Sequence, residues 1–130
     1  MKPILLDSNI LIAYLDIEHI HHKLVAQRID ESKAVFALST ISISECLVRA
    51  YEFDFEYAVA YQLSFDEIVS IYFDLDQAIA FNLAEIKSRN SVDLGDAIIW
   101  ATADLNKLEL WTLDRRLANK YKNSRYLLAG

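Results

Sequence analysis

The sequence predicts an α/β fold in which helices cover a parallel sheet, and this prediction rests on the order of two kinds of segment along the chain. Short apolar segments alternate along the chain with longer segments whose apolar residues recur at helical spacing. Strands that alternate with helices need crossover connections, and such connections make neighbouring strands parallel. With 130 residues, of which only 2 are Gly and 1 is Pro, the chain is expected to form one domain, residues 1–130, with short loops.

Short apolar or β-branched runs predict the strands, and apolar residues three to four positions apart predict the helices. The predicted strands are residues 4–6, 34–38, 68–73, 109–113 and 125–129. The predicted helices are residues 10–15, a segment through Ile17, Ile20 and Leu24 that ends near residue 32, residues 42–53, 56–65 and 77–89, a segment through Ala97, Ala101 and Leu105, and residues 117–121. Ligands of parallel sheets bind beyond the carboxyl ends of the strands, so chemistry is expected at that edge.

Four acidic residues lie where predicted strands end or predicted helices begin. Asp7 and Asp114 directly follow the first and fourth strands, whereas Glu45 and Asp96 are placed in the first turns of helices. If these ends share one edge of the sheet, the four carboxylates converge and repel one another. Mg²⁺ or Mn²⁺ would relieve that repulsion, because both ions prefer oxygen ligands. Such an ion activates a bound water and neutralises charge on a phosphoryl oxygen, so the natural substrate is a phosphodiester.

Each of these acids also has a purely structural explanation. Ser42 and Glu45 match a capping box, with Glu45 at the third helical position. Asp93 is suited to cap the helix that contains Asp96, and Asp114 is suited to cap the helix that follows it. Spacing alone leaves both explanations open, but the four acids together with their flanking residues favour a site.

The segments around the acids resemble the four sequence motifs of PIN domains, in the order in which that family has them. Residues 4–12, ILLDSNILI, resemble the first motif, an apolar strand followed by Asp-Ser/Thr-Asn. Residues 40–45, TISISE, resemble the second, and residues 110–114, LWTLD, resemble the fourth. Residues 94–103, LGDAIIWATA, resemble the third motif, which is the most specific, although Trp100 is bulky where a small or aliphatic residue is common.

The resemblance implies a three-layer α/β/α sandwich with a central parallel sheet (PIN-like) and an endoribonuclease that uses Mg²⁺ or Mn²⁺. It carries over Asp7, Glu45, Asp96 and Asp114 as catalytic acids, Asp7 and Asp96 as metal ligands, Glu45 and Asp114 as further candidate ligands, and Asn9 and Thr112 as polar support. The size of the chain resembles VapC-type toxins of toxin–antitoxin pairs. That resemblance implies a cognate antitoxin, a homodimer, and hydrolysis that leaves 5′-phosphate and 3′-hydroxyl ends.

Charge and cysteine content bear on partners and location. The formal net charge is -6, which is unusual for a protein that binds nucleic acid. The C-terminal part differs, because Arg115, Arg116, Lys120, Lys122 and Arg125 occur there without an acid. A basic edge beside an acidic pocket suits a metal nuclease, although a solvated terminal helix explains the same charges.

The lack of a long apolar run, of a signal-peptide pattern and of a second cysteine predicts a cytoplasmic protein without membrane contact.

An aromatic stretch crosses two neighbouring predicted helices. Its members are Tyr51, Phe53, Phe55, Tyr57, Tyr61 and Phe65. Core packing explains part of it, and the exposed remainder predicts a protein interface that accepts an amphipathic helix. The candidate partner-binding residues are Tyr51, Phe55, Tyr57 and Tyr61. An Arg or Lys of an inhibitory antitoxin segment is expected to pair with the acids and to take the place of the metal.

The histidines and the cysteine have simpler interpretations. His19 and His22 would share a helix face, but no further ligand supports a metal there, so they and His21 are expected on the surface. Cys46 has no evident base partner and is expected to be a small buried side chain.

Two other classes of function stay open. One is a PIN fold without catalysis that serves only as a binding module. The other is a Mg²⁺-dependent phosphotransfer domain of the receiver or haloacid-dehalogenase type. A phosphatase of the haloacid-dehalogenase type needs a second Asp two residues after the first, and Asn9 occupies that position here. A receiver could use Asp74 or Asp76 as its phosphoacceptor, but the Asp96 motif would then be unexplained. For the nuclease, transfer, ribosomal and messenger RNA are all candidate substrates, because the choice depends on surface shape.

Overall fold

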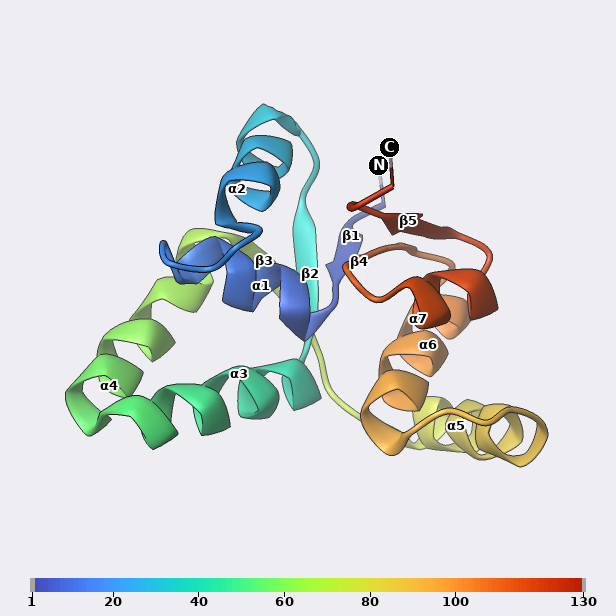
Figure 1. Ribbon diagram of the computed structural model, residues 1–130. Coiled ribbons are helices and arrows are strands. Elements are labelled where there is room, and N and C mark those ends of the chain that lie inside the picture. The colour runs from blue at the N-terminus through green and yellow to red at the C-terminus, as the bar shows by residue number, and fades with distance from the viewer. Residues whose placement is uncertain (1, 130) are drawn as a thin grey trace.

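The computed structural model describes residues 2–129, in which a five-stranded parallel sheet lies between two layers of helices (Figure 1). The strands are β1 (Ile4–Leu6), β2 (Phe36–Ser39), β3 (Val69–Phe73), β4 (Glu109–Thr112) and β5 (Ser124–Tyr126). The helices are α1 (Ser8–Leu15), α2 (His22–Glu31), α3 (Thr40–Phe53), α4 (Phe55–Ser64), η1 (Phe65–Glu67), α5 (Gln77–Arg89), α6 (Leu94–Asn106) and α7 (Arg115–Lys120). The strand order is β3-β2-β1-β4-β5, and each neighbouring pair is parallel. The predicted α/β/α sandwich is therefore confirmed.

Alternate residues of the central strands pack into two separate cores. Leu5, Ala37 and Leu110 are paired across the sheet and face α6 and α7. Leu6 and Trp111 point to the opposite face and pack against residues of α1 to α4. This period of two is what a sheet buried on both faces requires. In Figure 1, α1 to α4 accordingly lie on one side of the strands and α5 to α7 on the other.

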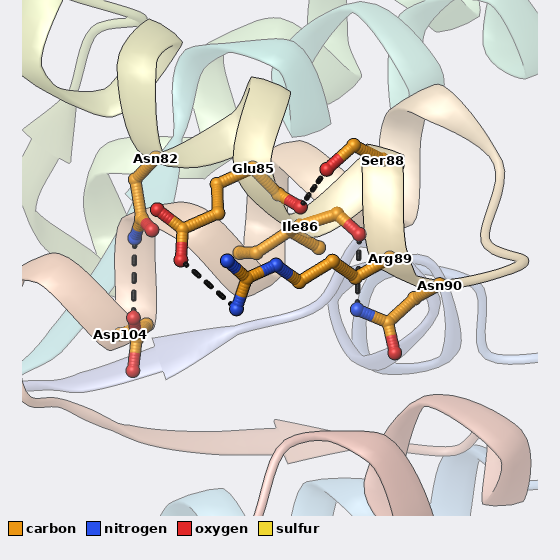
Figure 2. Close-up of polar contacts among 7 residues, drawn as sticks. All are labelled: Asn82, Glu85, Ile86, Ser88, Arg89, Asn90 and Asp104. Carbon is orange, nitrogen blue, oxygen red and sulfur yellow. Dashed lines mark hydrogen bonds and ion pairs between the residues drawn. The ribbon is translucent and has the colours of Figure 1, made fainter.

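Helix α5 packs on α6 instead of on the sheet. Ile86 of α5 and Ala97 of α6 share a small apolar cluster. Figure 2 shows the polar contact that joins the two helices, in which the Asn82 amide donates to the Asp104 carboxylate over 3.1 Å. The same view shows Asn90 Nδ2 donating to the carbonyl of Ile86 over 2.9 Å, next to the end of α5. The apolar cluster and the contact between Asn82 and Asp104 hold α5 against α6, whose first turn carries Asp96.

The connection between α1 and α2 differs from the prediction. The segment through Ile17 and Ile20 is a turn, and α2 begins only at His22. Asp16 ends α1 and accepts a hydrogen bond from the backbone N–H of Glu18 over 3.0 Å, which closes the turn. Ile20 is 87% exposed, so the apolar spacing that suggested a buried helix face was misleading.

Smaller differences concern the ends of strands. The second predicted strand begins at Phe36 instead of residue 34, and the last one covers Ser124–Tyr126 instead of residues 125–129. Beyond β5 the chain turns, because the N–H of Ala129 donates to the carbonyl of Tyr126 over 3.2 Å. No helix within residues 2–129 is both long enough and apolar enough to cross a membrane.

Candidate functional site

Asp7 is a buried carboxylate at the carboxyl edge of the sheet. It follows β1 and is only 3% exposed, and its N–H donates to the carbonyl of Trp111 on β4 over 3.0 Å. Its Oδ1 accepts from the N–H of Ser8 over 2.7 Å, and its Oδ2 accepts from Asn9 Nδ2 over 3.2 Å and from Thr112 Oγ1 over 2.8 Å. Burial raises the pKa of Asp7 from 3.8 to about 6, although the hydrogen bonds from Thr112 and Ser8 oppose the rise.

Asn9 and Thr112 connect Asp7 to the end of β4. The amide oxygen of Asn9 accepts from the N–H of Leu113 over 3.1 Å, which leaves its Nδ2 to donate to Asp7. The buried Thr112 hydroxyl donates to Asp7 and accepts from the N–H of Asp114 over 2.9 Å. The two residues predicted as polar support therefore both donate hydrogen bonds to Asp7, one of the four predicted acids.

Asp114 and Asp93 each cap a helix, as their positions predicted. Asp114 Oδ1 accepts from the N–H of Arg116 over 2.9 Å at the start of α7. Asp93 Oδ1 accepts from the N–H of Asp96 over 3.0 Å at the start of α6. Asp96 thus lies in the first turn of its helix, as expected. Burial, together with the charges of Asp7, Asp93 and Asp114, raises the pKa of Asp96 to about 6, so these acids lie within electrostatic reach of one another.

Glu45 occupies a different helical position from the predicted one. Helix α3 begins at Thr40 and is capped by Ser39, whose Oγ accepts from the N–H of Ile41 over 3.3 Å. Glu45 consequently lies in the second turn, and the capping box of Ser42 and Glu45 is wrong. The prediction failed because β2 runs on to Ser39 and the helix follows it without a loop.

Without a capping role, the Glu45 side chain approaches the start of α6. A Cβ placed on Gly95 would lie 2.9 Å from Glu45 Oε2, so the absence of a side chain at Gly95 makes room for this carboxylate. Partial burial of the carboxyl raises the pKa of Glu45, the charges of Asp96 and Asp93 add to the rise, and the Ser8 side chain opposes it. Sequence reasoning gave Gly95 no role and Asp93 only that of a cap, because neither spacing nor residue type reveals these through-space neighbours.

The acidic cluster comprises Asp7, Glu45, Asp93, Asp96 and Asp114. Within residues 2–129 the one ion pair joins Glu85 to Arg89, so none of the acids of the cluster forms an ion pair with a cationic side chain. Across the same residues, no three metal-ligating side chains lie close enough to form a ready-made cation site. The donors are all carboxylate oxygens, and burial and mutual repulsion raise the pKa of three of them. That chemistry fits a hard cation such as Mg²⁺, which keeps several waters among few protein ligands.

A groove of about 600 Å³ lies between α1, the turn after it, α3 and α4. Phe53 lines it and is 77% exposed, whereas Tyr61 lines it with a side chain that is only 7% exposed. Of the aromatic stretch, Tyr51, Phe53 and Phe55 are exposed, Tyr57 is half-buried, and Tyr61 and Phe65 are buried. The expectation that the Tyr61 side chain is exposed is therefore wrong, because its ring packs against those of Tyr57 and Phe65. Contact of Tyr61 with a partner stays a prediction.

The remaining candidate residues lie elsewhere. His19 falls in the turn before α2 and so does not share a helix face with His22, whose Nδ1 lies 2.9 Å from the carbonyl oxygen of Ala13. Cys46 is buried, as predicted, and burial raises its thiol pKa to about 12. Asp76 caps α5 by accepting from the N–H of Ile79 over 2.9 Å, and it follows the edge strand β3, which does not fit a receiver.

Fold and site together define a class of protein, a parallel α/β/α domain with a cluster of carboxylates at the carboxyl edge of its sheet. The chain belongs to the PIN domain family, whose model matches residues 4–123. No curated protein matches the sequence significantly.

Several solved structures share the fold. A toxin–antitoxin complex from Klebsiella pneumoniae matches with a TM-score of 0.80 and 24% identity over 98% of this chain and 99% of that one. DNA-bound VapBC from Salmonella typhimurium matches with 0.78 and 20% identity over 96% of each chain. VapC20 of Mycobacterium tuberculosis, a toxin that cleaves the sarcin-ricin loop, matches with 0.78 and 14% identity over 90% of this chain and 94% of that one.

Proposed function

We propose that this protein is a Mg²⁺-dependent endoribonuclease, with Mn²⁺ as an alternative ion, and that it is the toxin of a toxin–antitoxin pair. The observation that carries the proposal is the buried Asp7 carboxylate, with its raised pKa and with Glu45, Asp96 and Asp114 around it. Burial of a carboxyl among other acids is unfavourable, and perturbed carboxyl groups of this kind are concentrated at functional sites. Membership of the PIN domain family and the toxins among its structural neighbours support the same function.

In this proposal Asp7 and Asp96 would hold the ion, with Glu45 and Asp114 as further candidate ligands. Thr112 and Asn9 would keep the Asp7 oxygens in one orientation through the hydrogen bonds at 2.8 and 3.2 Å. When bound, the cation supplies an activated water and neutralises charge on the phosphoryl oxygen.

A protein nucleophile is a poor alternative. The Cys46 thiol has a pKa of about 12, so it stays protonated at neutral pH, and it is buried. Attack by water in line with the 3′-oxygen breaks the bond between phosphorus and that oxygen, which leaves a 5′-phosphate and a 3′-hydroxyl. These are the products that the proposal requires.

Activity is tested with the purified full chain and a structured RNA, in the presence of Mg²⁺ or excess chelator. Asp96→Asn is expected to lose cleavage while remaining folded. Asp74→Asn is the matched control, because Asp74 is an exposed acid after β3 that lies outside the cluster. A protein that binds RNA but never cleaves it with either ion would instead be a binding module.

The proposed partner is an antitoxin segment that lies in the groove beside α3 and α4. The groove combines apolar walls such as Phe53 and Ile12 with the charged side chains of Arg49 and Asp16. Its lining includes Cys46, whose thiol lies 3.8 Å from the carbonyl oxygen of Ser8, so the groove borders the acidic cluster. An amphipathic helix in the groove could therefore place an Arg or Lys against the acids.

The partner is tested by co-expression with the neighbouring reading frame, followed by purification and mass measurement of the complex. A complex with two copies of this chain is expected, and a toxin of this kind would act on RNA in the cytoplasm. Phe53→Ser should weaken the complex, whereas Phe81→Ser should not. Phe81 is similarly exposed but lies on α5, away from the groove.

A further inference from the structure

Helix α7 places two cations beside the acidic cluster. Arg116 and Lys120 are four residues apart, which puts both on one face of the helix. Both line a cavity of about 250 Å³ whose lining also includes Asp93 and Asp96. The cavity is several times larger than the roughly 30 Å³ that one water takes in the liquid. It therefore has room for a small charged group directly beside Asp96.

The other cations of this region face elsewhere. The Arg115 guanidinium lies 5.3 Å from the centre of the Tyr126 ring, and that of Arg125 lies 5.5 Å from the centre of the Trp111 ring. Within residues 2–129 no ion pair involves Arg116 or Lys120. Both are exposed, and both thus remain available to an anion.

The cavity is lined by two cations as well as by Asp93 and Asp96, and a phosphate could accept hydrogen bonds from both cations at once. A strand of RNA that approaches a protein of net charge -6 meets repulsion from the acidic cluster. Cations on one side of that cluster would hold the strand while the cluster itself acts on the neighbouring phosphodiester. Because Arg116 and Lys120 converge on one cavity, they would hold one phosphate between them.

We propose that Arg116 and Lys120 form a subsite for the backbone phosphate next to the one that is cut, which rests on the proposed nuclease function. The subsite lies on the α7 side of Asp96 and so fixes how the RNA strand enters the site. It contributes to substrate affinity and positioning, whereas the carboxylates carry out the reaction.

The test compares two double variants that lose the same charge. Arg116→Gln with Lys120→Gln removes the subsite, and Arg115→Gln with Lys122→Gln removes two nearby cations outside the cavity. Each pair is placed in the full chain carrying Asp7→Asn, which prevents cleavage. Binding of a short fluorescent single-stranded RNA is measured by anisotropy in Mg²⁺ over a range of salt concentrations, with thermal melts to verify folding.

The subsite pair should weaken binding roughly tenfold at moderate salt, as loss of a charge-assisted contact does. The slope of log affinity against log salt should become shallower by about 0.7, the value for one phosphate contact on a single strand. The control pair should keep the parent slope. Equal effects of both pairs on RNA binding would overturn the proposal. Unchanged RNA binding by the variant that lacks Arg116 and Lys120 would also overturn it.

These outcomes are separable from failure of the nuclease function itself. A protein that is no nuclease would show no Mg²⁺-dependent cleavage as wild type, whatever residues α7 carries. A nuclease without this subsite would cleave normally while the two double variants bind RNA alike. Absence of RNA binding by the parent protein would overturn the subsite as well.

Discussion

Replacement of Asp7 by Asn tests whether the ionised Asp7 side chain destabilises the metal-free protein. The pKa of Asp7 rises from 3.8 to about 6, mainly through burial. Each pKa unit corresponds to about 1.36 kcal/mol, so the ionised side chain lowers the free energy of unfolding of the metal-free protein by about 3 kcal/mol. Asn removes that charge, but its Nδ2 cannot accept the hydrogen bonds from Thr112 and Asn9, which costs about 1–3 kcal/mol. The variant is therefore expected to be as stable as the wild type or slightly more stable, yet inactive.

The pH dependence has a defined sign. Because the folded pKa of Asp7 is raised, its penalty is absent below the unfolded value of 3.8 and fully present above about 6. Between these values, Asp7 makes the metal-free wild type lose stability as pH rises. Asp7→Asn should lack this contribution, while Asp74→Asn, at an exposed acid, should retain it.

Urea unfolding in chelator from pH 4 to pH 8 measures both expectations. The reasoning would be refuted if Asp7→Asn were several kcal/mol less stable than the wild type at pH 7.5. It would also be refuted if the difference between the two proteins did not change with pH. Either result would make Asp7 a structural residue whose hydrogen bonds outweigh its charge.

Three further predictions concern the surroundings of the acids. Gly95→Ala should change the free energy of unfolding by no more than about 1 kcal/mol, because the new Cβ displaces only the flexible end of Glu45. It should nevertheless slow RNA cleavage, and equal cleavage rates for the variant and the wild type would contradict the role given to the Glu45 carboxylate. Thr112→Val should destabilise the fold by about 1–3 kcal/mol. It should also move the acidic limb of the pH–rate profile upward, because it removes a hydrogen bond that lowers the pKa of Asp7. Mg²⁺ at 100 times its dissociation constant should stabilise the wild type by about 2.7 kcal/mol in thermal melts, and Asp96→Asn should lose most of this gain.

The order of elements and the parallel sheet were predictable because their signals are local. Alternation of apolar runs and helical periodicity predicted every strand, and the structure shifts only their ends. The same signal failed at Ile17 and Ile20, where apolar residues at helical spacing lie in an exposed turn. Periodicity records spacing but not burial, so it cannot show that Asp16 ends α1.

The candidate site was predictable to the level of individual acids, but their environment was not. Asp7, Asp96 and Asp114 follow strands or begin helices, which the sequence shows directly. The position of Glu45 depends on where α3 begins, and a Ser/Thr-rich approach offers several equivalent caps. The Glu45 side chain on α3 approaches Gly95 on α6, and only the folded structure reveals that these two residues are neighbours.

The most direct test of the central claim is cleavage of RNA by the wild-type protein as Mg²⁺ is titrated, with analysis of the product ends. The account predicts no cleavage in excess chelator, recovery of activity with Mg²⁺ or Mn²⁺, and products with 5′-phosphate and 3′-hydroxyl ends. Cleavage that persists in chelator and leaves 2′,3′-cyclic phosphates would contradict it, because the acidic cluster would then have no part in the chemistry.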